Sequence, residues 1–142
     1  MLDYKQLSEK DSMYNTPPCY AIYITGLVFK WLLNEQKGLK EMQIKTNEKS
    51  KLLYNYIDST NGFYNAFVEP AYRSKMNCVF ILKNSGLTNQ FVSEAEATEL
   101  IGLAGHRSVG GCRASLYNAV SIQDVEALTA FMKQFHQKHQ QQ

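Results

Sequence analysis

The stretch that follows Pro17 and Pro18 is apolar on nearly every side, and this feature constrains the fold most. Its apolar residues are Tyr20, Ala21, Ile22, Tyr23 and Ile24, then Leu27, Val28 and Phe29, then Trp31, Leu32 and Leu33. Proline fits the first turn of a helix, where its missing N–H would have no partner. We therefore predict a helix from here to about Gln36, ending at Gly38, which is a good C-terminal cap.

A helix without a polar face must be covered on all sides. The chain has 142 residues, one ordinary domain and too little for two cores. We expect another domain or subunit to cover part of the helix; the alternative is a central core helix. The apolar segment is interrupted by Thr25 and Lys30 and is shorter than the roughly 18–20 residues of a membrane span, so no membrane partner is expected.

Composition narrows the class of protein further. With 44% hydrophobic and 20% charged residues the chain is globular, and a net charge of +2 is too small to indicate a nucleic-acid binder. Three isolated cysteines form no disulfide framework or paired zinc motif. Residues 1–5 are not typical of a secretory signal. We therefore expect a cytoplasmic protein that binds neither nucleic acid nor membranes.

The remaining segments predict an α+β fold, a mixed sheet with helices packed on it. Helices are expected at 39–58, 88–100 and from Ser121 to about His136, and strands at 63–68, 76–82, 101–104 and 112–117. In the helix 39–58, lysines including Lys49 are expected mostly on the polar side. In the last strand, Cys112 and Ala114 share one face and Arg113 the other.

The glycine-rich segment 105–113 is the strongest candidate for chemistry. Its three glycines let the backbone turn and approach a ligand closely, and they surround His106, Arg107 and, beyond them, Arg113, with no carboxylate between. Arginine forks match carboxylate and phosphate oxygens two at a time. Two basic groups, one in a loop and one on a strand, would suit a ligand with two negative groups. The alternative is a solvated turn whose arginines bond to carbonyls or nearby acids.

A second candidate lies just before the apolar helix. Asn15 and Thr16 stand where side-chain oxygens commonly cap the free amides of a helix, and for this segment alone the cap is the favoured interpretation. The same geometry also binds phosphate. His136 and His139 are spaced three apart, but they are expected in a polar tail without a third metal ligand. Cys112 is expected to be a packed core thiol.

Two segments together resemble the signatures of the phosphoserine aminotransferase family, pyridoxal-phosphate enzymes of the aspartate-aminotransferase fold type. They are Ser12-x-Tyr14-Asn15-Thr16-Pro17-Pro18 and the run from Gly105 through Val109-Gly110-Gly111 to Arg113-Ala114-Ser115. Asn61-Gly62-Phe63-Tyr64, Arg73-Ser74-Lys75-Met76-Asn77 and Leu116-Tyr117-Asn118-Ala119 match in order and spacing. The resemblance spans about residues 12–135. Cys78-Val79-Phe80 departs from it, because the family usually has a proline before the phenylalanine.

The resemblance implies a role for each candidate. Asn15 and Thr16 would hold the phosphate of pyridoxal 5'-phosphate in the partner subunit of a homodimer. His106 and Arg107 would bind the phosphate of the substrate, and Arg113 its α-carboxylate. The reaction implied is amino transfer from glutamate to 3-phosphohydroxypyruvate, which gives phosphoserine and 2-oxoglutarate for serine biosynthesis.

The resemblance also implies that the chain corresponds to the C-terminal part of the family. It would comprise an N-terminal segment, 1–16, with the cofactor-phosphate motif, and residues 17–142, the small C-terminal domain of fold-type-I transferases with the preceding interface helix. The Schiff-base lysine of the family lies upstream of the matched segments, and Lys83 stands in the wrong context. The chain alone is therefore expected to be inactive. The alternative is a stand-alone, non-catalytic domain that binds small phosphorylated acids.

Overall fold

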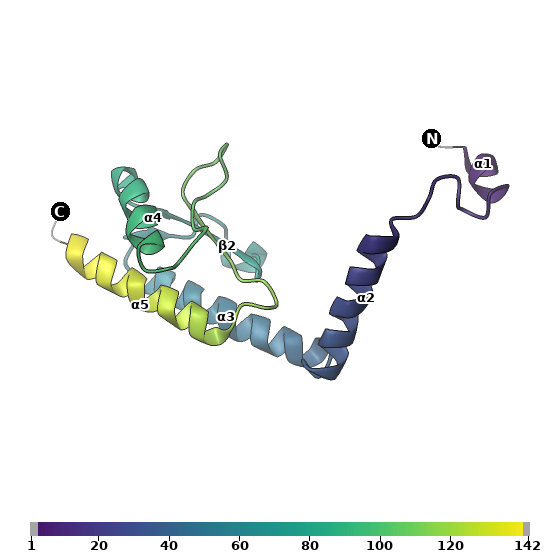
Figure 1. The fold of residues 1–142 in the computed structure, drawn as a ribbon. Coiled ribbons are helices and arrows are strands. Elements are labelled where there is room, and N and C mark those ends of the chain that lie inside the picture. The colour runs from purple at the N-terminus through teal and green to yellow at the C-terminus, as the bar shows by residue number, and fades with distance from the viewer. Residues whose placement is uncertain (1–2, 141–142) are drawn as a thin grey trace. The chain divides into compact units, whose positions relative to one another are not determined.

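The computed structural model describes residues 3–140, which belong to two compact units, Met1–Lys40 and Glu41–Gln142 (Figure 1). The first unit holds a short helix α1 (Tyr4–Ser8), the helix α2 (Cys19–Asn34) and the first residues of α3 (Leu39–Ser59). The helix α1 was not predicted. No helix within residues 3–140 is long and apolar enough to cross a membrane.

The helix α2 confirms the interpretation of the proline pair and of Gly38. It starts directly after Pro18 and ends where Lys37 and Gly38 adopt positive φ angles of 60° and 87°. The amide of Gly38 donates to the carbonyl of Leu32 at 2.8 Å, which closes the helix end. Leu32 is the one buried residue of α2. Large apolar side chains such as Tyr20, 79% exposed, face solvent.

The second unit is built on a three-stranded sheet of order β1-β2-β3, with β1 (Tyr64–Asn65), β2 (Asn77–Leu82) and β3 (Cys112–Ser115). Both pairings are antiparallel, whereas a mixed sheet was expected. The α+β class is confirmed. The predicted strand 101–104 is wrong in extent, because within it only Ala104 makes a bridge, to Cys112.

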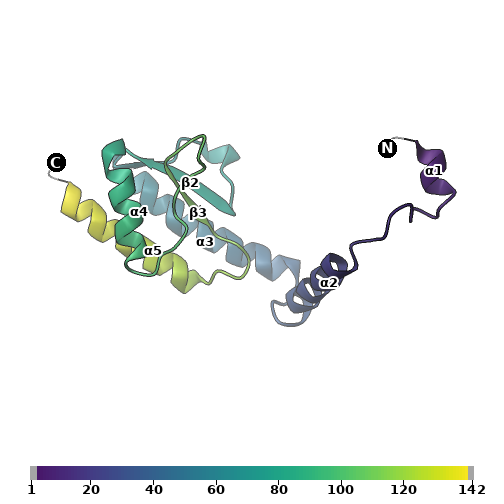
Figure 2. The ribbon, with the colours of Figure 1, turned by 45° about the horizontal axis from the view of Figure 1, so that its top comes forward.

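Three helices cover one face of this sheet. The helices α3 and α5 (Ile122–His139) lie side by side, and α4 (Thr88–Glu96) lies beside them (Figures 1 and 2). A short 3₁₀ turn at Pro70–Tyr72 precedes β2, and another at Ser85–Leu87 precedes α4. The largest fully buried side chains come from every layer: Leu53, Ile57, Tyr64, Phe80, Phe91, Val125, Met132 and Phe135. The sequence predicted the start of α5 correctly, since Ser121 and Asp124 form a reciprocal capping box.

Two charged or titratable residues lie where the sequence did not place them. Lys49 was expected on the polar side of α3, but it is buried, and its Nζ donates to the carbonyl oxygens of Tyr117 and Val120, each at 2.8 Å. His139 was expected in a polar tail beyond a helix that ended near His136. It lies inside α5, is 7% exposed, and stacks on Phe135 with ring centroids 4.4 Å apart.

Two other elements are shorter than predicted. The strand expected over 63–68 pairs only at 64–65, and the chain then bends into the loop that carries Pro70. The helix expected over 88–100 ends at Glu96. Glu99 has a positive φ of 66° and the amide of Leu100 turns back to the carbonyl of Ala95, which terminates the helix.

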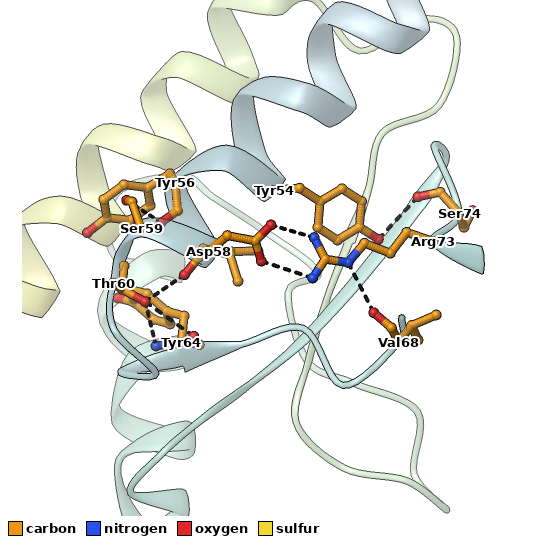
Figure 3. A network of polar contacts seen from close by, with 10 residues as sticks. Tyr54, Tyr56, Asp58, Ser59, Thr60, Tyr64, Val68, Arg73 and Ser74 are labelled. Carbon is orange, nitrogen blue, oxygen red and sulfur yellow. Dashed lines mark hydrogen bonds and ion pairs between the residues drawn. The ribbon is translucent and has the colours of Figure 1, made fainter. Parts of the chain in front are cut away.

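A polar network fixes the loop between β1 and β2 against the end of α3 (Figure 3). The guanidinium of Arg73 donates to both carboxylate oxygens of Asp58, at 2.6 and 2.9 Å, and its Nε donates to the carbonyl of Val68 at 3.0 Å. The same guanidinium lies 4.8 Å from the ring centroid of Tyr54. The bidentate ion pair raises the pKa of Arg73. This network sets the path of the chain just after Phe67.

Candidate anion-binding site

The loop 105–111 leaves the sheet and returns to it at one narrow neck. At the neck the amide of Gly105 donates to the carbonyl of Gly111 at 2.9 Å. A Cβ atom on Gly105 would lie 2.0 Å from the carbonyl oxygen of Gly110, and one on Gly111, at φ +69°, would lie 2.9 Å from that of Phe80. The glycines were expected to let the backbone approach a ligand closely. In the structure they let two stretches of the chain approach each other.

His106 is oriented by hydrogen bonds inside the loop. Its Nδ1 lies 2.6 Å from Oγ of Ser108 and accepts the backbone N–H of Ser108 at 3.3 Å. The hydroxyl of Ser108 therefore lies against Nδ1. The carbonyl of His106 accepts the amides of Val109 and Gly110, which closes the turn. The side chain of His106 is exposed, so its imidazole is open to a ligand.

Arg113 lies on the face of the sheet opposite the core. Its strand β3 alternates, with Cys112 and Ala114 buried and Arg113 partly exposed, as predicted. Arg113 pairs with Val79 across the ladder, and its amide donates to the carbonyl of Leu103 at 2.8 Å, so its backbone is held on both sides. The Nε of its guanidinium is buried and has no hydrogen-bond partner among the described residues.

Arg107 lies on the exposed loop, whereas Arg113 lies on the strand β3, as predicted. Within residues 3–140, the side chain of neither Arg107 nor Arg113 bonds to a carbonyl or carboxylate. The interpretation as a turn with self-satisfied arginines is therefore not supported. Two guanidinium groups remain available for a ligand, at different distances from the sheet.

Two hollows connect these side chains. One of about 230 Å³ is lined by His106, Arg113, Val79 and the half-exposed Phe67. The other, of about 400 Å³, is lined by His106, Arg107 and one side of α4 from Thr88 to the carboxylate of Glu96. His106 borders both, so it lies between the loop arginine and the strand arginine. Sequence reasoning did not identify Phe67 as part of the site, because nothing in its local sequence indicates that its loop reaches Arg113.

Asn15 and Thr16 belong to the first compact unit. Both are exposed, and neither side chain makes a hydrogen bond within residues 3–140. The residue that precedes α2 is Pro18, and no side chain caps the helix there. The interpretation of Asn15 or Thr16 as a helix cap is therefore wrong. An uncapped helix start beside a free hydroxyl and a free amide is able to bind an anion.

The other sequence candidates are inert or structural. Cys112 is buried, and burial raises the pKa of its thiol to about 12, which makes it the packed core thiol that was predicted. Among residues 3–140 no group of three or more His, Cys, Asp or Glu side chains could hold a metal ion. All three cysteines are free.

The class of the protein follows from comparison with known families. The sequence profile of the aminotransferase class-V family matches residues 1–128. The chain belongs to this family.

Within the family, two similar relatives carry the name phosphoserine aminotransferase. The chain is 53% identical to "Phosphoserine aminotransferase 1, chloroplastic" of Arabidopsis thaliana, over 98% of this chain and 32% of that protein. It is 47% identical to the phosphoserine aminotransferase of Bacillus subtilis, over 99% of this chain and 39% of that protein. The chain therefore spans about a third to two fifths of the length of these relatives.

Solved structures agree with the sequence relatives. The phosphoserine aminotransferase of Bacillus circulans subsp. alkalophilus superposes with a TM-score of 0.86 at 42% identity, covering 95% of this chain and 37% of that one. The PLP-bound phosphoserine aminotransferase of Trichomonas vaginalis gives a TM-score of 0.80 at 39% identity, covering 92% and 37%. The resemblance inferred from the glycine-rich and proline segments is thus confirmed.

Proposed function

We propose that this chain is the C-terminal portion of a cytoplasmic, pyridoxal-phosphate-dependent phosphoserine aminotransferase. The reaction is amino transfer from glutamate to 3-phosphohydroxypyruvate, which yields phosphoserine and 2-oxoglutarate. Within it, His106 and Arg107 bind the phosphate of the substrate and Arg113 binds the α-carboxylate. Residues 1–16 form the segment with the cofactor-phosphate motif, and residues 17–142 form the C-terminal domain.

The observation that carries this assignment is the position of His106 between two arginines that lack internal partners. His106 shares one hollow with Arg113 and another with Arg107. A phosphorylated α-keto acid carries a phosphate at one end and a carboxylate at the other. The buried, unpartnered Nε of Arg113 favours a fixed carboxylate ligand, because an unpaired buried donor is costly. The exposed Arg107 suits the more highly charged phosphate.

The residues at the start of α2 fit the phosphate of pyridoxal phosphate. The hydroxyl of Thr16 and the side-chain amide of Asn15 offer donors that make no hydrogen bond within residues 3–140, and no side chain caps the first turn of α2, although the amide of Cys19 donates to the carbonyl of Pro17. These residues would hold the phosphate of the cofactor across the dimer. When bound, pyridoxal phosphate supplies the electron sink that amino transfer requires. The part of Arg113 and His106 is to orient the acid substrate and to neutralise its charges.

The apolar surface of α2 supports the homodimer. Tyr20, Tyr23, Phe29 and Leu33 are all more than half exposed within this chain. Exposed apolar patches of this kind mark interaction sites. A second subunit that covers α2 would also bring Asn15 and Thr16 to the catalytic centre of its partner.

The assignment is tested with the intact protein that contains this chain. Steady-state kinetics are measured for the wild type, Arg107→Ala and Arg113→Ala, with phosphoserine and with glutamate as amino donor. Loss of a fixed charge partner costs about 2–5 kcal/mol, or at least roughly 30-fold in kcat/KM. We expect Arg113→Ala to reduce kcat/KM for both donors, because both carry an α-carboxylate. Arg107→Ala is expected to affect phosphoserine more than glutamate.

A conservative control separates charge from geometry. Arg113→Lys keeps the charge but loses the planar fork. We therefore expect its kcat/KM to lie between that of Arg113→Ala and that of the wild type. Unchanged kinetics in both alanine variants would remove the two-anion assignment. If Arg107→Ala lowered kcat/KM equally for phosphoserine and glutamate, the assignment of Arg107 to the phosphate would be wrong.

A further inference from the structure

Three apolar side chains surround the hollow that Arg113 borders, and the proposed function does not use them. Phe67, Val79 and Val109 line this hollow of about 230 Å³ together with Arg113 and His106. Among the described residues, no Asp or Glu contributes to its lining. Phe67 is 50% exposed, so a large aromatic ring borders both solvent and a charged group. We refer to Phe67, Val79 and Val109 as the apolar wall of the site.

The position of Phe67 is set by the two residues beside it. Ala66 is buried in the hydrophobic core, and the carbonyl of Val68 accepts the Nε–H of Arg73 at 3.0 Å. Arg73 is itself held by the carboxylate of Asp58 at the end of α3 (Figure 3). The backbone on both sides of Phe67 is therefore fixed in the absence of a ligand. A wall that is already in place costs no ordering entropy when a ligand binds.

Val79 is the cross-strand partner of Arg113. The amide of Arg113 donates to the carbonyl of Leu103, away from β2, so Val79 and Arg113 form a non-hydrogen-bonded pair of the ladder. In antiparallel sheets the side chains of such pairs lie closer together than those of hydrogen-bonded pairs. The aliphatic stem of Arg113 therefore has Val79 as its neighbour on the face of the sheet opposite the core.

The apolar wall changes the strength of an ion pair formed at Arg113. The attraction between two charges grows as the dielectric constant around them falls, and salt screens an enclosed pair less than an exposed one. The Nε atom of Arg113 is already closed to solvent, whereas the residue as a whole is partly exposed and borders the hollow. Part of the cost of removing water from this guanidinium is therefore met on folding rather than on binding.

We propose that Phe67 is a positioning residue for carboxylate recognition. With Val79 and Val109 it keeps water away from the ion pair between Arg113 and the α-carboxylate of the substrate. The proposal rests on the assignment of Arg113 to that carboxylate under the proposed function. Its consequence is a specific one: removal of the ring weakens ligands that carry a carboxylate and spares ligands that carry only a phosphate.

Calorimetric titration of the intact, cofactor-loaded protein tests this with two unreactive ligands. 3-Phosphoglycerate carries a phosphate and a carboxylate but neither an amino nor a keto group. 2-Hydroxyethyl phosphate is the same molecule without the carboxylate. The ratio of their Kd values measures what the carboxylate contributes to binding. For Phe67→Ala we expect this ratio to fall about 5- to 20-fold, while the Kd of 2-hydroxyethyl phosphate changes less than about 2-fold.

A matched pair of substitutions separates the apolar character of the ring from its bulk. Leucine and glutamine are similar in size, but only leucine is apolar. We expect Phe67→Leu to keep the ratio within about 3-fold of the wild type and Phe67→Gln to lose as much as Phe67→Ala. The control is Tyr72→Ala, which removes an aromatic ring of the same loop that is 78% exposed and does not line the hollow. It should leave both Kd values unchanged.

Salt provides a second readout that a loss of packing alone would not change. Between about 50 and 500 mM KCl the ratio should fall more steeply in Phe67→Ala than in the wild type, because the pair at Arg113 is then open to screening. The same salt dependence in both proteins would contradict the exclusion of water by Phe67.

Arg113→Ala distinguishes failure of this inference from failure of the proposed function. If Arg113→Ala leaves the ratio unchanged, Arg113 does not bind the carboxylate and the proposed function loses that assignment. If Arg113→Ala lowers the ratio and Phe67→Ala does not, only the role of Phe67 is wrong. Equal losses in Phe67→Leu and Phe67→Gln would show that apolar character is not what matters. A similar loss of affinity for both ligands in Phe67→Ala would show general damage to the site instead of a role in carboxylate recognition.

Discussion

The ammonium group of Lys49 donates a 2.8 Å hydrogen bond to the main-chain carbonyl of Tyr117, 68 positions further along the chain. The same Nζ also reaches the carbonyl oxygens of Val120 at 2.8 Å and Leu116 at 3.5 Å. One buried lysine of α3 thus binds three carbonyl groups of the segment that joins β3 to α5. Because β3 ends at Ser115, this connection begins three residues after Arg113, the strand arginine for which we propose a role in substrate binding.

Lys49→Met should destabilise the protein strongly. Methionine fills the space of the lysine stem but leaves carbonyl groups without a donor, and each buried unpaired group costs about 1–3 kcal/mol. We expect a loss of about 2–4 kcal/mol in the free energy of unfolding, measured by urea titration. The exposed neighbour Lys51→Met is the control and should change stability by less than about 0.5 kcal/mol. Equal effects of the two substitutions would show that Lys49 is not a structural donor.

The Arg73–Asp58 pair should show a measurable coupling energy. The pair is bidentate and the side chain of Arg73 is 13% exposed, but that of Asp58 is 50% exposed, so solvent screens part of the attraction. We expect a coupling of about 1 kcal/mol in a double-mutant cycle with alanine at both positions. The Lys138–Glu94 pair, a single contact at 2.8 Å with side chains 57% and 34% exposed, is the comparison and should give a smaller value. A larger coupling for Lys138–Glu94 would contradict this ranking.

Gly105→Ala should disturb the neck of the loop that carries His106. A Cβ atom would collide with the carbonyl oxygen of Gly110, so the backbone has to move, at a cost of about 1–3 kcal/mol. The matched control is Gly102→Ala, where φ is +80° but nothing lies within 4 Å of the new atom. Gly102→Ala should cost only the backbone strain, about 1 kcal/mol. Thermal unfolding and the KM for phosphoserine are the measurements, and a smaller effect at Gly105 than at Gly102 would refute the steric explanation.

Stability should fall at alkaline pH in part because of Cys112. Burial raises the pKa of this thiol from 9.0 to about 12 in the folded protein. Above pH 9 the unfolded chain loses the proton that the folded chain keeps. The contribution of Cys112 is therefore complete below pH 9 and is lost progressively between pH 9 and 12.

At pH 10.5 the loss from this one group should reach about 2 kcal/mol. Urea unfolding at pH 7.5, 9 and 10.5 measures it. Cys112→Ala should start from a lower stability but decline less steeply with pH. Burial also raises the pKa of Cys78, to about 11, so a residual slope will remain. Parallel declines for the wild type and Cys112→Ala would rule out the thiol as a source.

Local signals in the sequence were sufficient for the helices with clear ends. Pro18 and Gly38 bracket α2, and Ser121 with Asp124 starts α5, because the groups that cap a helix lie within a few residues of its ends. The alternation of β3 likewise placed Arg113 on the face opposite Cys112. Residue types alone predicted an anion site at the glycine-rich loop, and that assignment stays a prediction.

Features that depend on distant segments could not be predicted in this way. Lys49 lies among charged residues of α3 and its sequence context indicates exposure, but the carbonyls that bury it come from a connection nearly seventy residues later. His139 is buried by the packing of α5 rather than by its polar neighbours. Phe67 lines the hollow of Arg113 from a loop that Arg73 connects to Val68 and Asp58.

The bridge between Ala104 and Cys112 has a consequence for colloidal behaviour. Together with the bond from the amide of Arg113 to the carbonyl of Leu103, it occupies the outer rim of β3, where open backbone groups would otherwise invite a strand from another molecule. The short irregular segment at Leu103 and Ala104 thus protects the edge of β3 from pairing with a strand of another molecule. Insertions at the neck near Gly105 that displace this segment should expose the edge of β3 and promote polymerisation through it.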